Sequence, residues 1–250
     1  MNYALVILCG GNSVRMGTDK ALLPFGDCCL LEYLVHKFKP YFSTIYLSVK
    51  YIGDYAYLNL PVTEIADVYG NAGPMSGVFS GLSMINEDAA FFMSVDTPFM
   101  EPETGIALLD AIGDADICMV RGKAGYLDPA TAAYSKNCIP TIGKSLILRQ
   151  FTFDALREKC KTVCVTEKAL AACTDIPVDR QFFNLDTRQD YYQALKIYLQ
   201  LKHRNLSATA LPKETRQFRH PVSKKYFVPA DSLPHISEEM MKTLHLLLPF

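Results

Sequence analysis

The feature that most constrains the fold is the first apolar run of the chain and the glycine-rich stretch after it. Tyr3–Leu8 is short and continuously apolar, which is typical of a strand buried on both faces of a parallel sheet. Residues 8–20 then read Leu-Cys-Gly-Gly-Asn-Ser-Val-Arg-Met-Gly-Thr-Asp-Lys. Glycines let backbone N–H groups approach an anion, and Arg15 and Lys20 add positive charge. The stretch therefore predicts a strand that opens into a polyphosphate-binding loop.

The spacing of this loop excludes the two commonest phosphate-binding motifs. A P-loop requires Gly-x4-Gly-Lys-Ser/Thr, whereas Gly17 is followed by Thr-Asp-Lys. The dinucleotide fingerprint Gly-x-Gly-x-x-Gly also fails, because Gly10 and Gly11 are adjacent. The predicted phosphate-binding loop therefore follows neither of these patterns.

Apolar patterns along the chain alternate between strand and helix. Strands are expected at 3–9, 45–49, 62–65, 90–95, 116–120 and 162–165. Helices are expected at 31–38, 75–85, 103–112, 146–158 and 187–201. Strands separated by helices imply right-handed crossovers, so we predict an α/β fold with three layers: a mainly parallel, twisted, Rossmann-like sheet with helices on both faces. Ligands of such sheets bind beyond the carboxyl ends of the strands, where the glycine-rich loop and Asp96 both fall.

The loop resembles the signature of the molybdenum cofactor guanylyltransferases, Leu-Ala-Gly-Gly-x-Ser-x-Arg-Met-Gly-x-Asp-Lys, with Cys9 in place of the usual Ala. That family transfers GMP from GTP to molybdopterin and releases pyrophosphate. The resemblance covers residues 3–200 and implies the family's nucleotidyltransferase fold and Mg2+-dependent activity. It also implies GTP and molybdopterin as partners.

The resemblance implies roles for the loop residues in nucleotide binding. The nucleotide contacts would come from the first four residues of the motif, Leu8, Cys9, Gly10 and Gly11. Backbone donors at the two glycines would face the phosphates. Arg15 would contact the β- and γ-phosphates, because its planar fork suits phosphate oxygens, and Lys20 would reach the α-phosphate. The alternative is a tight turn carrying two solvated cations.

Two aspartates match further elements of the family. Asp96 ends an apolar strand and precedes Thr97-Pro98, which resembles the family's Cys-Asp-x-Pro segment, whose Asp ligates Mg2+. Mg2+ prefers oxygen ligands, so a carboxylate suits it; the alternative is a cap on a helix after Pro98. Asp67 precedes Gly-Pro-Met-Ser-Gly at 73–77, which resembles an element whose Asp lies in the nucleotide site. Its alternative is an ordinary loop acid.

A segment near the end of the domain resembles the family's acceptor-binding motif. Phe-Asn-Leu-Asp-Thr at 183–187 is similar to Asn-x-Asn-Thr, which lies near the pterin. Asn184 matches, whereas Asp186 stands where the guanylyltransferases usually have a second Asn. An Asp there would strengthen Mg2+ binding or shift the acceptor preference. The alternative is a turn before the capping box Thr187-x-x-Asp190. Residues 126–129 are interpreted as structural.

The choice of base rests on the glycine pair, and other functions stay open. Within the resemblance, Leu-x-Gly-Gly goes with guanine, whereas cytidylyltransferase relatives carry Ala-Gly in the last two positions. Gly10 leaves room for a purine, so GTP is favoured over CTP. The alternatives are a molybdopterin cytidylyltransferase or a sugar-phosphate nucleotidyltransferase on the same fold. A nucleotide-binding or cofactor-delivery protein without transferase activity is a further one.

Composition and charge narrow the partners and divide the chain. A net charge of −1 over 250 residues gives no argument for nucleic acid binding. With no apolar run of about 18 residues and no signal peptide, we expect a cytoplasmic protein with no membrane contact. The strand–helix alternation ends near His203, so we predict a nucleotidyltransferase domain at 1–202 and an extension at 203–250. The extension would cap the domain, form a dimer or dock a molybdoenzyme or its chaperone.

Overall fold

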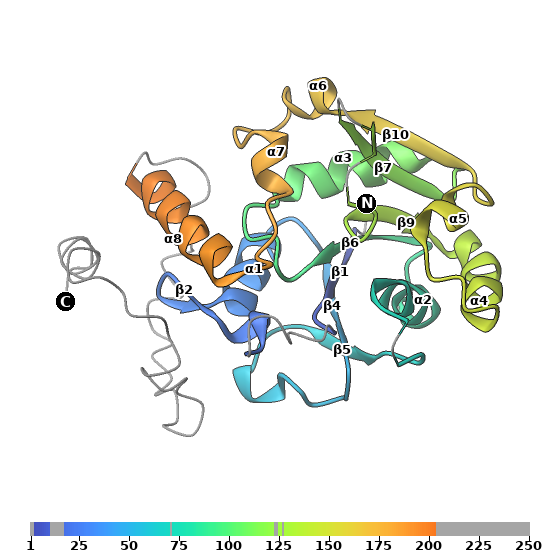
Figure 1. Ribbon diagram of the computed structural model, residues 1–250, viewed down its shortest axis with the longest axis horizontal. Coiled ribbons are helices and arrows are strands. Elements are labelled where there is room, and N and C mark those ends of the chain that lie inside the picture. The colour runs from blue at the N-terminus through green and yellow to red at the C-terminus, as the bar shows by residue number, and fades with distance from the viewer. Residues whose placement is uncertain (1–2, 11–17, 71, 123–124, 127, 204–250) are drawn as a thin grey trace. The chain divides into compact units, whose positions relative to one another are not determined.

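The computed structural model describes residues 3–10, 18–70, 72–122, 125–126 and 128–203 (Figure 1). The chain divides into two units, Met1–Pro212 and Lys213–Phe250. The second unit lies outside the described residues, as does nearly all of the expected extension at 203–250. The role of that extension therefore stays a prediction.

One large sheet organises the first unit. Its strands are β1 (Ala4–Leu8), β4 (Thr44–Val49), β5 (Thr63–Ala66), β6 (Ala89–Ser94), β7 (Ile117–Gly122), β8 (Gly125–Tyr126), β9 (Ala132–Ser135) and β10 (Thr162–Thr166). They lie in the order β10-β7-β9-β6-β1-β4-β5, with β8 paired to β7. A separate hairpin consists of β2 (Pro24–Phe25) and β3 (Cys28–Cys29). The predicted strands are thus present, shifted at their ends by a residue or two.

The direction of the strands decides which loops share an edge. The pairs β1–β4, β1–β6, β4–β5 and β7–β10 are parallel. Strand β9 pairs antiparallel with both β6 and β7. The chain therefore enters β9 at the same edge where the parallel strands end. The sequence did not predict this short strand.

Helices cover both faces, as the three-layer prediction required (Figure 1). The helices are α1 (Leu30–Phe38), α2 (Pro74–Met84), α3 (Pro102–Ile112), α4 (Ile139–Ile147), α5 (Phe153–Arg157), α6 (Glu167–Leu170), α7 (Val178–Gln181) and α8 (Arg188–His203). Short 3-10 turns occur at Lys20–Leu22, Ala56–Leu58 and Lys136–Cys138. In the part of the chain that is described, no helix combines the length and apolar character that a bilayer span requires.

The alternation of side chains along β1 separates two cores. Leu5 and Ile7 belong to the core that also contains residues of α1, α3 and α8, whereas Val6 and Leu8 belong to the core that contains residues of α2, α4 and α5. A strand that is apolar on both faces therefore lies in the middle of the sheet, and its carboxyl end lies in the middle of the edge.

The prediction of a helix at 146–158 is wrong. Helix α4 ends at Ile147 and α5 begins at Phe153. Arg149 between them has a φ of 55°, a left-handed conformation that a continuing helix does not allow. The apolar spacing of two short helices on one face imitated that of one long helix.

Candidate functional site

The loops after β1 and β4 are joined by backbone hydrogen bonds. The N–H groups of Cys9 and Gly10 donate to the Ser48 carbonyl at 2.9 and 3.1 Å. On the other side of β1, the Val95 N–H donates to the Leu8 carbonyl at 3.1 Å. The ends of β1, β4 and β6 therefore form one continuous edge, and the residues after them lie close together.

Gly10 faces a carboxylate. A Cβ at Gly10 would lie 2.9 Å from Asp67 Oδ2, so any other residue would push the carboxylate away. Asp67 is itself held by the Ser48 hydroxyl, which donates to Oδ1 at 2.6 Å, and by its own N–H, which donates to the Val49 carbonyl. Burial raises the pKa of Asp67, and the hydrogen bond from Ser48 opposes that rise.

The contribution of Gly10 differs from the one predicted. We expected its N–H to face the phosphates, but this N–H is used by the Ser48 carbonyl. What Gly10 supplies is the absence of a Cβ beside Asp67. Leu8 and Cys9 are buried, and the Cys9 thiol points toward the Ile7 carbonyl. Gly11 and Arg15 lie outside the described residues, so their predicted roles stay predictions.

The N-terminal part of α2 packs closely against Ser48, next to Asp67. Gly73 has a φ of 62°, which lets the chain turn, and Pro74 opens the helix. A Cβ at Gly77 would lie 2.6 Å from Ser48 Oγ and 2.7 Å from Leu8 Cδ2. The glycines at 73–77 therefore bring a helix N-terminus beside Ser48, the residue that holds Asp67.

A second group of charges lies where β6 ends. Lys20 Nζ lies 2.7 Å from Asp96 Oδ2 and 3.5 Å from Asp186 Oδ1. The side chains of Lys20 and Asp96 are only 17% and 16% exposed, whereas Asp186 is 56% exposed. Asp19 fixes the backbone in front of Lys20, because its carboxylate accepts from the Ala21 N–H at 2.9 Å. The chain thus brings three predicted site residues together.

The predicted acceptor segment lies directly beside Asp96. The Leu185 N–H donates to the Asp96 carbonyl at 3.0 Å, which places Asn184 and Asp186 on either side of that contact. Asn184 Oδ1 is buried and has no hydrogen-bond partner among the described residues. The helix after Asp96 begins at Pro102 with Glu101 as its cap, so the alternative role of Asp96 as a helix cap is wrong.

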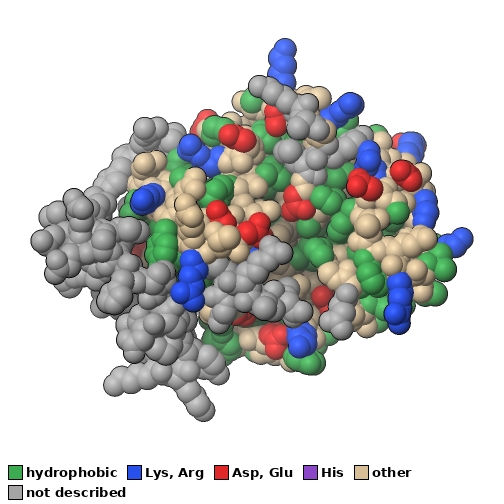
Figure 2. Space-filling view, in the orientation of Figure 1, with side chains coloured by type: hydrophobic (Ala, Val, Ile, Leu, Met, Phe, Trp, Pro, Cys, Tyr) green, Lys and Arg blue, Asp and Glu red, His purple; other side chains and the backbone are tan. Residues whose placement is uncertain are grey.

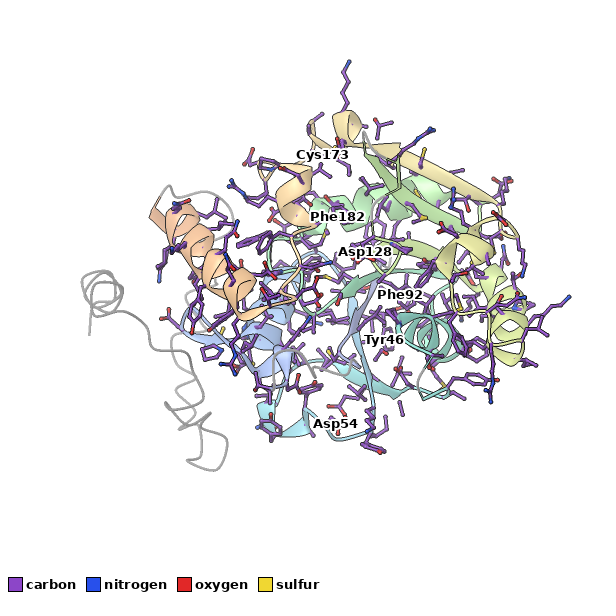
Figure 3. All side chains as sticks on the ribbon, viewed as in Figure 1. Tyr46, Asp54, Phe92, Asp128, Cys173 and Phe182 are labelled. Atoms are coloured by element: carbon purple, nitrogen blue, oxygen red, sulfur yellow. The ribbon has the colours of Figure 1, made fainter. Side chains whose placement is uncertain are left out.

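The sequence analysis did not predict that Asp128, which is labelled in Figure 3, lies near this site. Its carboxylate accepts from the Ala130 N–H at 2.9 Å and from the Thr131 hydroxyl at 3.2 Å, so Asp128 helps to shape the turn that leads into β9. Burial raises the pKa of Asp128, and the negative charges of Asp96 and Asp186 raise it further. Asp128 therefore lies within electrostatic reach of Asp96 and Asp186. The signal that could have found it was β9, because this strand starts at the carboxyl edge.

The donors at this cluster fit Mg2+. Asp96 and Asp186 are carboxylates that converge on one cationic group, Lys20 Nζ, so the surroundings already stabilise positive charge at that point. Mg2+ usually binds through one or two carboxylates, with water and phosphate oxygens completing its shell. Within the described residues no three His, Cys, Asp or Glu side chains form a ready-made metal cage. The fit is therefore to a metal that arrives with phosphate ligands. Figure 2 shows acidic side chains gathered on this face.

Comparison with known families agrees with this geometry. The family model described as a MobA-like NTP transferase domain matches residues 5–157. The chain belongs to this family. The matched range contains Gly10, Lys20, Asp67, Asp96 and Asp128, and it ends before the segment of Asn184 and Asp186.

Relatives of this MobA-like protein extend the likeness through that segment. A probable molybdenum cofactor guanylyltransferase of Carboxydothermus hydrogenoformans is 30% identical over 197 residues, which cover 79% of this chain and 97% of the relative. One of the same name from Pelotomaculum thermopropionicum is 30% identical, with 76% and 90% covered. The crystal structure of molybdopterin-guanine dinucleotide biosynthesis protein A from Archaeoglobus fulgidus superposes with a TM-score of 0.68 at 18% identity. It covers 78% of this chain and 97% of that protein, and it supports the fold.

Proposed function

We propose that this protein transfers GMP from GTP to molybdopterin and releases pyrophosphate, with Mg2+ as its metal. The observation that carries the proposal is the meeting of Lys20, Asp96 and Asp186 at the edge where Gly10 faces Asp67. Membership in the MobA-like family and the names of its relatives supply the substrate class. A lysine with two carboxylates that fit a metal, and the half-buried carboxylate of Asp67 on the same edge, suit the two ends of a nucleoside triphosphate.

Lys20 has the position required to stabilise charge during the transfer. Nucleotidyl transfer forms a bond between an acceptor oxygen and the α-phosphorus and breaks the bond from that phosphorus to the β-phosphate oxygen. Negative charge develops on the leaving pyrophosphate, and a preorganised cation lowers its energy. Lys20 is held in place by the Asp19 cap and by its two carboxylate partners, so its ammonium needs little reorganisation.

Asp96 and Asp186 would hold the metal. Mg2+, when bound, supplies Lewis-acid neutralisation of phosphate oxygens and orients them. Asp96 is the better-fixed ligand, because its backbone carbonyl is tied to the Leu185 N–H and its side chain is mostly buried. Asp186 is more exposed and lies on the acceptor segment, so it would adjust as substrates enter.

The base and ribose would lie on the Asp67 side. The Cys9 and Gly10 amides are satisfied by Ser48, and Asp67 keeps Oδ2 free of any hydrogen bond from a described residue. A carboxylate there accepts from donors such as the N–H groups of guanine or the hydroxyls of ribose. The missing Cβ at Gly10 leaves the approach open.

A transfer assay with matched nucleotides tests the proposal. The purified chain would be incubated with molybdopterin, Mg2+ and either labelled GTP or labelled CTP, and the dinucleotide product and pyrophosphate would be measured. We expect label transfer from GTP. Transfer from CTP but not from GTP would overturn the choice of base. Nucleotide binding without pyrophosphate release from either would favour a non-catalytic delivery protein.

A further inference from the structure

The carboxamide of Gln181 uses all of its hydrogen-bonding capacity inside the protein. The residue is fully buried and is the last residue of α7. Its Oε1 accepts from the Thr104 hydroxyl at 2.6 Å and from the Glu101 N–H at 3.3 Å. Its Nε2 donates to the Ile176 carbonyl at 2.8 Å and to Thr174 Oγ1 at 3.0 Å. A carboxamide offers two donors and two acceptor positions, so none is left over.

Backbone partners fix the orientation of this carboxamide. The Glu101 N–H can only donate and the Ile176 carbonyl can only accept. A flipped carboxamide would leave the Glu101 N–H without a partner and turn Oε1 toward the Ile176 carbonyl, which is costly in a dry interior. Gln181 therefore holds the end of α7 against the start of α3 in a single arrangement.

The two segments that Gln181 joins both lead to the site. Glu101 lies shortly after Asp96, and Gln181 lies shortly before Asn184 and Asp186. The segments meet again where the Leu185 N–H donates to the Asp96 carbonyl. The rings of Phe99 and Phe183, one from each segment, pack between these two contacts with centroids 6.4 Å apart. In Figure 3, the labelled Phe182 marks the point where the chain leaves α7.

A buried ion pair extends the connection to a third element. Lys37 Nζ of α1 lies 2.7 Å from Glu101 Oε1, and the two side chains are 10% and 5% exposed. Glu101 is therefore held by α1 through its side chain and by Gln181 through its N–H. A residue that is fixed on two sides gives Gln181 a rigid support.

We propose that Gln181 is a positioning residue that sets the acceptor segment, Asn184 and Asp186, against Asp96. The inference rests on the proposed function, because it takes that segment to contact the pterin acceptor. Gln181 does not touch substrate, since its side chain has no exposed surface. It acts through the backbone that follows it.

The expected effect is selective for one substrate. None of the hydrogen bonds of Gln181 involves Gly10, Ser48 or Asp67. Loosening the acceptor segment should therefore weaken acceptor binding and alignment, while the nucleotide side keeps its contacts. A general loss of stability would instead affect both substrates.

The first experiment measures this selectivity in Gln181→Met, which keeps a long side chain but removes all four hydrogen bonds. We expect the KM for molybdopterin to rise by about tenfold or more, because small misplacements of a substrate-positioning group are costly. The Kd for GTP should stay within about twofold of the wild-type value. Thr104→Val, which removes one bond and conserves volume, should show the same split at a smaller size.

Two comparisons separate positioning from stability. Leu156→Ala removes a fully buried side chain from α5, outside this network, and serves as a control that loses stability without losing a hydrogen bond of Gln181. It should leave the KM for molybdopterin unchanged. In Gln181→Glu, the KM for molybdopterin should move back toward the wild-type value as the pH falls, because only the protonated acid can donate to Ile176 or Thr174. An equal KM change in Leu156→Ala would overturn the proposal.

Hydrogen exchange tests the positioning without any transfer reaction. In Gln181→Met, the peptide containing Leu185 should exchange several-fold faster, while the peptide of β1 should not change. Unchanged exchange at Leu185 overturns the inference, whatever the activity. Faster exchange in a chain whose wild type transfers no GMP would keep the positioning role and reject the proposed function instead.

Discussion

The carboxyl edge of the sheet holds two carboxylate sites that differ in what surrounds the charge. Asp67 lies among neutral groups: the Ser48 hydroxyl, the backbone of Val49 and the bare Cα of Gly10. Asp96 lies among charges, with Lys20 at 2.7 Å and with Asp186 and Asp128 nearby. One half of the edge can recognise a ligand by shape and hydrogen bonds, and the other half can bind metal and phosphate.

The comparison shows that the two halves of the edge depend on different properties of their residues. Close packing in the Asp67 half depends on Gly10 beside Asp67 and Gly77 beside Ser48, so this half tolerates no added side chain at these two positions. The Asp96 half depends on balancing opposite charges, so it tolerates changes of shape better than changes of charge. Substitutions that alter only shape or only charge should therefore affect the two halves differently.

The largest effect should come from charge removal in the Asp96 half. We expect Lys20→Ala and Asp96→Asn each to lower kcat by about 100-fold or more, because preorganised charge is a dominant contribution to such catalysis. Steady-state pyrophosphate release measures the effect. The matched controls are Lys161→Ala and Asp114→Asn, an exposed ion pair remote from the edge, which should leave kcat unchanged. A wild-type kcat in Lys20→Ala would show that Lys20 does not contribute to catalysis.

In the Asp67 half, an added methyl group should weaken GTP binding. Gly10→Ala would place a Cβ 2.9 Å from Asp67 Oδ2, whereas a Cβ at Gly70 meets nothing within 4 Å. We expect Gly10→Ala to weaken GTP binding by about 1 to 2 kcal/mol through displacement of Asp67. Calorimetric titration with GTP would measure this, with Gly70→Ala as the control. Equal affinities of both variants would contradict a role for the close approach.

A smaller effect is expected at Asp186, the more exposed of the two carboxylates that contact Lys20. Asp186→Asn should raise the Mg2+ concentration for half-maximal activity by about threefold to tenfold, since an exposed charge contributes modestly. Magnesium titration at saturating GTP measures it. Asp179→Asn, on the exposed surface of α7, should not alter the magnesium dependence. If Asp186→Asn instead changed only the KM for molybdopterin, its role would lie with the acceptor.

The smallest effect concerns Asp128 and stability. Burial and two negative neighbours raise its pKa above the usual 3.8, so the ionised form at neutral pH opposes folding. Asp128→Asn should then be more stable than wild type at pH 7 by less than about 1 kcal/mol. The gain should shrink as the pH falls through the raised pKa and vanish below 3.8, where the wild-type group is protonated in both states.

Thermal unfolding of the metal-free protein across this pH range measures the difference between Asp128→Asn and wild type. Asp88→Asn, which removes an exposed charge, provides the baseline for a change of net charge alone. A stability gain that grows toward low pH would mean that the surroundings of Asp128 stabilise its ionised form, contrary to the raised pKa.

Sequence patterns predicted those features whose position in the fold follows from residues that are close together in the chain. The run Tyr3–Leu8 is apolar on both faces, so it had to lie centrally, and the residues at its end had to meet those after β6. The capping box was also confirmed, since Asp190 accepts from the Thr187 N–H and its own N–H donates to the Thr187 hydroxyl. These features depend on residues that are close in sequence or on one strong apolar strand.

The features that sequence missed depend on long-range pairing. Strand β9 is four residues of small and aromatic side chains, and only its pairing with β6 and β7 makes it a strand. Without β9, nothing in the sequence places Asp128 within electrostatic reach of Asp96. The hydrogen bonds of Gln181 likewise link residues from α3 and α7, and an isolated Gln at a helix end gives no local signal for them.

The most direct test is a structure of the chain soaked with Mn2+ and a non-hydrolysable GTP analogue, in which anomalous scattering locates the metal. The account predicts Mn2+ bound by Asp96, the triphosphate beside Lys20 and the guanosine against Asp67, all in one ligand. A metal away from Asp96, or a nucleotide whose phosphates and base lie elsewhere on the molecule, would contradict it.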